Sequence, residues 1–524
     1  MSVHRAVLAQ AIVEARLRLR SPATAIAVML LGAGAVLWIP DPSGRAASLT
    51  WRGADGTVFS SVYSSHYLSW ATAIVGGIIS IVGFYLVAGS IRRDRERGVG
   101  AILAATPLSG PAYLAGKFAA HLAYLSAISF LAVGAGVVAF VRWGTGLLDP
   151  LAFLSTWALF VIPGVAFTAA LAVFFGVTPG LKGRAGLVIW FFAFAALASG
   201  FTARRADGRL EHLPRFDPFG MATLQWMVEE SMPQATGIST GLIFHKEPIT
   251  RVDWTGVTVT PAVLRQRFLS LLAALLPLAA ATLFFDRFDP ARARRFRRVL
   301  RERATNPAAA FETLPDAPAF VPGRGDAPSP SAMRSILAEA RLTWDAASVL
   351  KWPLLAGALI PPFLPAAAFP FGAAALLLLL APTIAEVSAR EELAGTRALV
   401  FSQPGVPLSP VLWKAGAILA FVLALGLPCA ARAAMESLAA GAAFLAGLLF
   451  TAGLAAGFGS LSGGGKLFLG VYTALWYFAV NRLPIADFTG LFAEPFAGSV
   501  ALFLWMGVLA TGAAWAVERT STRN

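Results

Sequence analysis

Long apolar stretches separated by short polar ones run through the whole chain. A helix needs about 20 apolar residues to cross the ~30 Å hydrocarbon layer of a membrane. Twelve stretches meet or approach that length: 22–40, 67–91, 118–141, 151–176, 186–203, 267–286, 352–369, 370–388, 411–429, 437–458, 467–481 and 499–517. The pattern therefore predicts an all-α polytopic membrane protein with about twelve transmembrane helices.

The composition agrees with this class. Of the 524 residues, 57% are hydrophobic and only 13% are charged, against about 25% charged in a typical soluble domain. The single cysteine, Cys429, excludes an intrachain disulfide, and the five histidines lack metal-ligand spacing. The N-terminus lacks the order of charge, short apolar core and cleavage site of a signal peptide. We therefore expect the first apolar stretch to remain in the protein.

The net charge of +14 is distributed in clusters rather than spread evenly. Basic residues gather at 5–20, 92–97, 182–184 and 292–303. With twelve spans and a cytoplasmic N-terminus, all four clusters fall on the cytoplasmic side, as in most membrane proteins. The pattern favours a multi-pass protein of the cytoplasmic (inner) membrane, with both termini cytoplasmic. It indicates contact with anionic membrane lipids and not with nucleic acid.

Two short amphipathic segments precede the first and seventh stretches. The sequence EARL occurs at 14–17 and again at 339–342. In the first segment, Gln10, Glu14 and Arg18 lie opposite an apolar stripe; the stripes of the two segments comprise Leu8, Ile12, Ala15 and Leu19, and Met333, Leu337, Ala340 and Trp344. This spacing predicts two helices that lie in the membrane interface.

A second repeated segment follows the second and eighth stretches. It reads RRDRERGVGAILAATPLSGPAYLAGK at 92–117 and REELAGTRALVFSQPGVPLSPVLWK at 390–414. A glycine, a proline and a lysine have the same spacing in both: Gly98, Pro107 and Lys117, and Gly395, Pro404 and Lys414. Acidic residues precede each glycine: Asp94 and Glu96, and Glu391 and Glu392. Residues 100–109 predict a short helix along the membrane that ends at Pro107. Such a loop can transmit motion from a cytoplasmic partner, or it can simply anchor the spans.

These anchors divide the chain into two similar halves. We expect a first six-span half at 1–286, a basic and proline-rich cytoplasmic linker at 287–334 that begins as a helix, and a second six-span half at 335–524. The first half has two larger outer loops, 41–66 and 204–266. We expect a β-hairpin at 50–60, a short helix in RFDPFGMATLQWMVEE, and a second hairpin formed by ISTGLIF and RVDWTGVTVTP.

The repeated loop resembles the first cytoplasmic loop of type-2 ATP-binding cassette (ABC) transporter permeases. The resemblance implies two fused six-span halves, elbow helices, and coupling helices that dock on two separately encoded ATPase subunits. It implies export of a hydrophobic or amphipathic substrate by a permease that is not itself an enzyme. The residues that it marks in the loops are Glu96, Gly98, Pro107, Lys117, Glu391, Glu392, Gly395, Pro404 and Lys414.

Two details qualify the resemblance. FDPFG at 216–220 resembles a stretch before the last span of permeases grouped with multicopper-enzyme maturation systems, and the second half has ADFTG at 486–490. The first loop has Val99 where the family commonly has threonine, and the second loop has Thr396.

The segment LSGGGK at 461–466 superficially resembles a nucleotide-binding motif. A phosphate-binding loop requires G-x-x-x-x-G-K-[ST] between a strand and a helix, whereas Leu467 follows the lysine here. We therefore expect a tight cytoplasmic turn between the tenth and eleventh spans. The sequence predicts no ATP site and no cofactor in this chain.

Two other classes remain as alternatives. Major-facilitator secondary transporters also have two parallel six-span halves, and GSIRRDRERG approaches their loop motif. Ion-coupled carriers, however, need ionisable groups inside the membrane, and the predicted spans contain few: His121 and Glu386, both near span ends. A membrane enzyme is the third class, but no nucleophile, metal-ligand or paired-carboxylate pattern is evident in the spans.

Overall fold

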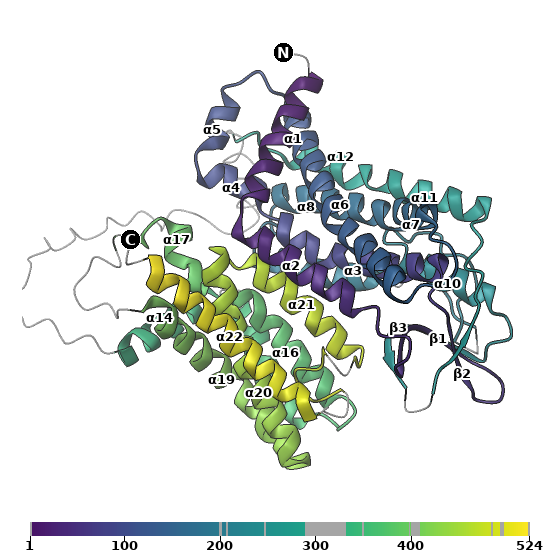
Figure 1. Cartoon of the computed structure of the whole chain (residues 1–524). Helices are drawn as coiled ribbons and strands as arrows, with labels where there is room; N and C mark the ends of the chain where they lie inside the picture. Colours follow the sequence, from purple (N-terminus) through teal and green to yellow (C-terminus); the bar gives the residue numbers. More distant parts are fainter. Residues whose placement is uncertain are drawn as a thin grey trace, which may run out of the picture.

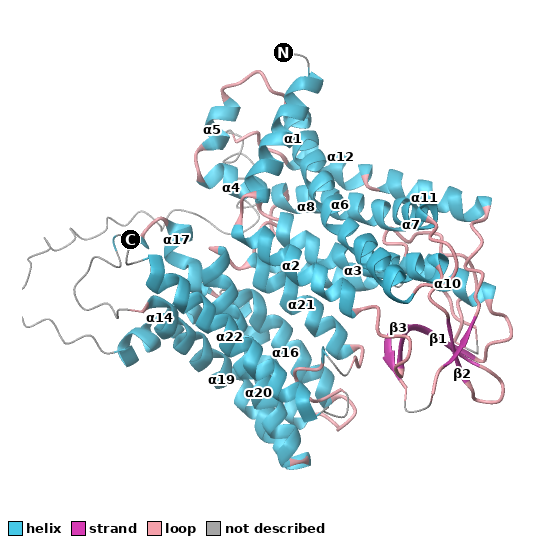
Figure 2. Ribbon diagram, viewed as in Figure 1, coloured by secondary structure: helices cyan, strands magenta, loops and turns pink. Residues whose placement is uncertain are grey.

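The computed structural model describes residues 3–198, 202–205, 208–245, 248–288, 332–347, 350–397, 399, 409–483, 486–492 and 497–521. The chain is predominantly helical (Figure 1, Figure 2). Helices of the first half gather in one body and those of the second half in another, and the two bodies lie side by side (Figure 1). The predicted helix in the linker falls outside the described residues.

The helices of the first half are α1 (Val3–Leu19), α2 (Pro22–Leu37), α3 (Ser65–Val87), α4 (Ser90–Glu96), α5 (Val99–Ala104), α6 (Gly110–Trp143), α7 (Pro150–Thr156), α8 (Ile162–Val177), α9 (Arg184–Ala198), α10 (Met221–Ser231), α11 (Pro261–Ala273) and α12 (Leu275–Phe284). Those of the second half are α14 (Ala332–Ala346), α15 (Lys351–Leu359), α16 (Phe369–Ile384), α17 (Arg390–Ala394), α19 (Pro410–Glu436), α20 (Leu438–Ser462), α21 (Lys466–Val480) and α22 (Ala497–Ser521). Short helical turns connect several of them: Trp157–Val161 (α7 to α8), Pro361–Phe363 and Val387–Ala389.

Eight helical segments in the described residues are long and apolar enough to cross a membrane, or up to ten if each of two bent pairs is one span. The chain is therefore a multi-pass membrane protein by the length and composition of its helices. Each of the twelve predicted stretches overlaps a helix, but α9 and α21 have only 15 residues each. The predicted total of twelve spans thus exceeds what helix length alone supports.

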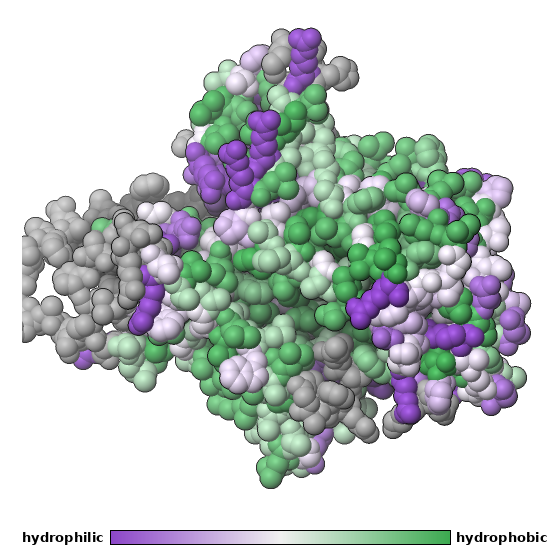
Figure 3. All heavy atoms as spheres, viewed as in Figure 1, coloured by the Kyte–Doolittle hydropathy of each residue, from purple (hydrophilic) through white to green (hydrophobic). Residues whose placement is uncertain are grey.

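The surface has the polarity of a protein embedded in lipid. Hydrophobic residues cover the middle of the face drawn in Figure 3, while hydrophilic residues gather where α1 and α4 project and around the strands. Leu276 in α12 and Leu509 in α22 are among the apolar side chains that are exposed. An apolar surface of this kind is unfavourable in water and favourable against hydrocarbon chains.

Both amphipathic segments are helical. Unlike a surface helix of a soluble protein, each turns its apolar face outward and its polar face toward the protein. In α1, Leu8, Ile12 and Leu19 are exposed while Glu14 and Arg18 are buried against the protein. In α14, Met333 and Leu337 are likewise exposed and Glu339 is buried, so apolar stripes face outward as an interfacial helix requires. The chain bends by 74° between α1 and α2, where Pro22 removes a backbone donor and ends α1.

The two larger loops of the first half, 41–66 and 204–266, combine in one four-stranded sheet. The strands are β1 (Ala46–Arg52), β2 (Val58–Ser61), β3 (Gly237–Phe244) and β4 (Thr250–Val252), in the order β3-β1-β2-β4. The predicted hairpin at 50–60 is confirmed by the antiparallel pairing of β1 with β2. The predicted hairpin of β3 with β4 is wrong: β3 pairs with β1, and β4 pairs in parallel with β2. The β1–β2 hairpin lies between β3 and β4. Each of its two edges has backbone groups that are free to pair, so one edge binds β3 and the other binds β4.

The segments FDPFG and ADFTG form the same kind of turn. In the first, Asp217 accepts a hydrogen bond from the backbone of Gly220 at 2.9 Å; in the second, Asp487 accepts one from Gly490 at 3.0 Å. Both glycines have positive φ, 75° and 64°, which favours glycine. Burial raises the pKa of Asp217, although Arg267 and the hydrogen bonds from Thr223 act in the opposite direction.

The central contact between the halves is the packing of α21 against α3. A Cβ atom on Gly470 would lie 2.9 Å from Val82 Cγ1, so the two helices touch closely there. The rings of Phe191 and Trp476 meet edge to face with centroids 4.8 Å apart. We call the end of these helices near α4 and α17 the loop side, and the end near the β-strands the strand side.

Glycines allow the closest helix contact in the second half, between α20 and α22. A Cβ atom on Gly453 would lie 2.7 Å from the backbone oxygen of Gly507, whereas one on Gly512 would meet nothing within 4 Å. We therefore expect Gly453→Ala to lower the stability of the purified protein by about 1–3 kcal/mol through overpacking. Gly512→Ala should leave stability unchanged or raise it by up to about 1 kcal/mol. Thermal unfolding in detergent measures both, and equal effects would contradict the close approach of α20 and α22.

Candidate functional site

The predicted first loop is a pair of short helices between α3 and α6. Gly89 and Gly98, both with φ of 74°, begin α4 and α5. The predicted helix is present as α5, which ends before Pro107 as expected. Ser109 then caps α6 by accepting a hydrogen bond from the backbone of Ala112 at 3.4 Å.

A buried group of charges holds this loop in place. We call Glu14, Arg18, Arg93, Asp94 and Lys117 the first charge cluster. The Glu14 carboxylate lies 3.0 Å from Arg18, 2.6 Å from Arg93 and 2.7 Å from Lys117. Lys117 also lies 2.7 Å from Asp94. The cluster therefore joins three separate elements, namely α1, α4 and α6.

Hydrogen bonds to uncharged groups extend the first charge cluster. Tyr113 donates its hydroxyl hydrogen to Asp94 at 2.6 Å, and Arg18 donates to the backbone oxygen of Leu86 at 2.8 Å. His121 lies about three turns inside α6, which begins at Gly110, and its ring is 3.1 Å from the Ser90 hydroxyl. The cluster has three cations and only two carboxylates, so one positive charge has no carboxylate of its own. Arg18 places that charge against the backbone oxygens at the C-terminal end of α3, where the partial charge of the helix end is negative.

The second loop has a corresponding arrangement, which we call the second charge cluster: Glu339, Arg390, Glu391 and Lys414. Arg390 of α17 forms an ion pair with Glu339 of α14 and donates a hydrogen bond to Thr343 at 3.1 Å. Lys414 of α19 forms an ion pair with Glu391 and donates to the Val387 oxygen at 2.8 Å. An elbow helix, a loop helix and the next long helix are again joined.

The two clusters use residues at corresponding positions of the chain. EARL recurs after 325 residues and the loop after 297, and these offsets relate Glu14 to Glu339, Arg93 to Arg390, Asp94 to Glu391, and Lys117 to Lys414. Arg18 corresponds to Thr343, so the second cluster lacks the extra cation. The amphipathic pattern predicted two interfacial helices but not these clusters, because periodicity does not say which distant residues the polar face of a helix meets. The repeated glutamate of EARL was the signal that could have revealed them.

The nine loop residues singled out from the sequence fall into two groups. Lys117, Lys414 and Glu391 are buried or largely buried within the charge clusters. Five others lie on the exposed surface of the loops: Glu96, Gly98, Pro107, Glu392 and Gly395. Pro404 lies outside the described residues. The loops thus have an internal face that holds them and an external face that is free for contact.

The exposed face of the loops is both acidic and apolar. The side chains of Glu96 and Glu392 are 61% and 55% exposed, and each forms an ion pair with an arginine of its own loop, at 3.4 and 3.7 Å. Ile102 in α5 is 69% exposed, and Leu393 in α17 is also exposed. Exposed apolar side chains between charged ones are typical of a protein contact surface.

Two hollows lie along the packing of α3 against α21. The one on the strand side holds about 1530 Å³ of space, including the part open to solvent, and is lined by Ile78, Gln225, Phe244 and Tyr477 among others. The one on the loop side is much smaller, with about 60 Å³ of its own, and is lined by residues including Tyr85, Arg92 and Lys466. The contacts of Gly470 with Val82 and of Trp476 with Phe191 close the space between them.

The segment LSGGGK forms the expected tight turn. It connects α20, which ends at Ser462, with α21, which begins at Lys466, and Gly463 has a φ of 62°. Within the described residues, no group of three or more His, Cys, Asp or Glu side chains is placed to hold a metal ion.

Comparisons with known proteins identify no relative: no family model, no curated protein and no solved structure matches this chain.

The first charge cluster predicts a large effect for one conservative substitution. Glu14→Gln removes the carboxylate shared by three cations while its side chain is only 4% exposed. We expect a loss of about 3–5 kcal/mol in unfolding free energy, because buried cations are left unpaired. Glu96→Gln, which breaks an exposed pair, should change stability by less than about 1 kcal/mol. Unfolding in detergent compares the two, and an equally small change for Glu14→Gln would rule out the structural importance of the cluster.

Proposed function

We propose that this chain is the transmembrane permease subunit of an ABC transporter, with two six-span halves fused in one polypeptide. Two separately encoded ATPase subunits dock on the loop side, at α5 in the first half and around α17 in the second. The chain itself holds no ATP and catalyses no reaction. It exports a hydrophobic or amphipathic substrate across the cytoplasmic membrane.

The observation that carries the proposal is the pair of charge clusters. The first cluster fixes α4, which directly precedes α5, and the second fixes α17, each to an elbow helix and to the following long helix, so a force on the loop reaches the spans without being absorbed by it. The exposed Glu96 and Glu392 on the outer face of these loops supply acidic contacts for a partner. Matching contacts at corresponding positions also support an internal repeat, with α9 and α21 as short fifth and eleventh spans.

Transport then proceeds by motion between the two halves. ATP brings the two ATPases together, the loops move with them, and the halves rock about the contact between α3 and α21. The two hollows at the ends of this contact support alternating access, because opening the contact of Gly470 with Val82 joins them. The binding energy of ATP thus replaces an ion gradient as the driving force.

A substitution in each loop tests the docking role. We expect the double variant Glu96→Lys, Glu392→Lys to abolish the stimulation of ATP hydrolysis that the permease exerts on its co-purified ATPase, because both acidic contacts become repulsive. Glu436→Lys is the matched control: it makes the same charge change on an exposed side chain at the far end of α19. Reconstituted ATPase activity is the measurement.

Two results of that experiment oppose the proposal. Full stimulation in the double variant would exclude these carboxylates from the contact. A chain that purifies without any ATPase and dissipates a proton gradient in proteoliposomes would instead favour the major-facilitator alternative.

Single-cysteine labelling tests the orientation of the loops. Cys429 is the single cysteine of the chain, so a Cys429→Ala background leaves no thiol to label. Because Cys429 is buried, its own labelling in the unsubstituted protein should also be low. In intact cells, a membrane-impermeant maleimide should label Asp55→Cys in the β1–β2 turn but not Glu96→Cys or Glu392→Cys. Both loop positions should label after permeabilisation, and labelling of Glu96→Cys in intact cells would refute a cytoplasmic loop side.

A further inference from the structure

The hollow on the strand side lies between the two halves and is the larger of the two. It has about 590 Å³ of its own, against about 60 Å³ for the one on the loop side. Cavities of about 300–1,000 Å³ bind small organic ligands, so of these two hollows the one on the strand side has room for a ligand. The first half contributes Trp38, Ile74 and Met221 among others to its lining, and the second half contributes Phe478 and Arg482.

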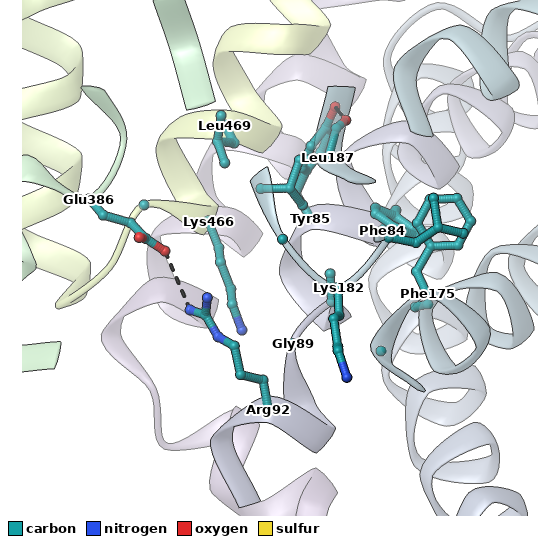
Figure 4. Close-up of a pocket in the computed structure, with 16 residues that line it drawn as sticks. Phe84, Tyr85, Gly89, Arg92, Phe175, Lys182, Leu187, Glu386, Lys466 and Leu469 are labelled. Atoms are coloured by element: carbon teal, nitrogen blue, oxygen red, sulfur yellow. Dashed lines mark hydrogen bonds and ion pairs between the residues drawn. The ribbon is translucent and has the colours of Figure 1, made fainter. Parts of the chain in front are cut away.

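The loop side is closed by comparison. Arg92 of α4 and Lys466 of α21 extend from opposite sides into the small hollow there (Figure 4). Arg92 also lies 3.5 Å from Glu386 of the second half, so an ion pair joins the two halves at this end. The close contact of Gly470 with Val82 lies between the hollows. The structure is thus open toward the strand side and closed toward the loop side.

The lining of the strand-side hollow changes from apolar to polar toward solvent. Ile78 and Trp38 are buried, and the ring of Trp38 packs against that of Phe478 from the other half, with centroids 5.7 Å apart. Asn481 and Arg482 are exposed and form part of the rim. A ligand with a hydrocarbon chain inside the hollow and a polar head at the rim matches this gradient.

The backbone of Arg482 points to a role for its side chain. The end of α21 has the hydrogen bonds of a Schellman motif: the N–H of Leu483 donates to the oxygen of Phe478 at 3.0 Å, and that of Arg482 to the oxygen of Ala479 at 2.9 Å. The position of Arg482 in this motif ordinarily holds glycine, because its φ of 61° is unfavourable for a residue with a Cβ atom. Unfavourable backbone conformations of this kind gather at functional sites.

The guanidinium group of Arg482 is available to a ligand. It forms no hydrogen bond or ion pair with any residue that the structure describes. Arg204, the other arginine of the lining, donates to the backbone oxygen of Gly208 at 2.7 Å, which is an uncharged partner. No carboxylate is among the described residues that line the hollow. Because arginine binds carboxylate and phosphate groups through two parallel hydrogen bonds, the rim suits an anionic head.

We propose that the strand-side hollow binds a single-chain amphiphile with an anionic head, which Arg482 holds at the rim while the chain lies against Trp38, Ile78 and Phe478. A phospholipid with two long chains is larger than the ligands that cavities of this size hold. The identification of this ligand with the exported substrate rests on the proposed function, whereas its binding here does not.

Photoaffinity labelling of the purified full-length chain, in nanodiscs of phosphatidylcholine, tests the proposal without an ATPase. The probe is a laurate analogue with a diazirine at the end of its chain. We expect saturable labelling that mass spectrometry maps to α3 and α10, and competition by unlabelled laurate. Dodecyltrimethylammonium has a chain of the same length and the opposite charge, so it should not compete. Labelling that maps elsewhere, or equal competition by dodecyltrimethylammonium or by dioleoyl phosphatidylglycerol, would overturn the proposal.

Two substitutions of one residue separate binding from folding. Arg482→Gln should weaken the saturable labelling by about tenfold or more, the effect of losing a charged hydrogen bond. Arg482→Gly should weaken it as much and also raise Tm, because glycine adopts a positive φ without strain. A purely structural role of the arginine would not give a more stable protein that has lost its ligand. Arg142→Gln is the matched control, since Arg142 is exposed at the strand-side end of α6 and outside the hollow, and it should have no effect.

A further variant tests the place of the chain. Ala195 lines the hollow, so Ala195→Phe should fill part of it and abolish the saturable labelling. Unchanged labelling in this variant, unchanged labelling in both Arg482 variants, or equal weakening by Arg142→Gln would overturn the proposal. None of these results bears on ATPase docking, which the loop substitutions test separately.

Discussion

The architecture depends on a carboxylate that is buried where a membrane-interface helix meets the protein. Glu14 in α1 binds an arginine of the loop and a lysine of the following span, and Glu339 in α14 binds the loop arginine of its own half. Breaking such a buried pair leaves a charge without solvation, which costs far more than an exposed pair contributes. The elbow helix, the loop helix and the following long helix of each half, α6 or α19, therefore behave as one rigid unit.

In the proposed mechanism, this rigidity lets a partner at the loops move the spans. A loop that flexed would dissipate a push from a partner, whereas a loop fixed to two other elements passes it on. The proposed receiving element is the contact between α3 and α21, which is lined by small and apolar residues such as Gly470 and Val82. A contact of this kind can open and close without breaking ion pairs in the middle of the membrane.

The two halves are similar at the two charge clusters and different elsewhere. The first charge cluster includes Arg18, where the second half has Thr343. The four-stranded sheet belongs entirely to the first half, since all its strands lie in the loops that follow α2 and α9. Motions of equal size at the two loops therefore need not produce equal motions on the strand side.

The sequence by itself determined the class of the protein and the location of its helices, because hydrophobic length and helical spacing are local properties. It also located the loop helix that ends before Pro107 and the β1–β2 hairpin. Only the tertiary structure decided that Glu14 and Glu339 face inward, that β3 and β4 lie on opposite edges of one sheet, and that Lys466 meets Arg92 in a shared hollow. These features depend on pairing between residues far apart in the chain, and neither periodicity nor composition records such pairing.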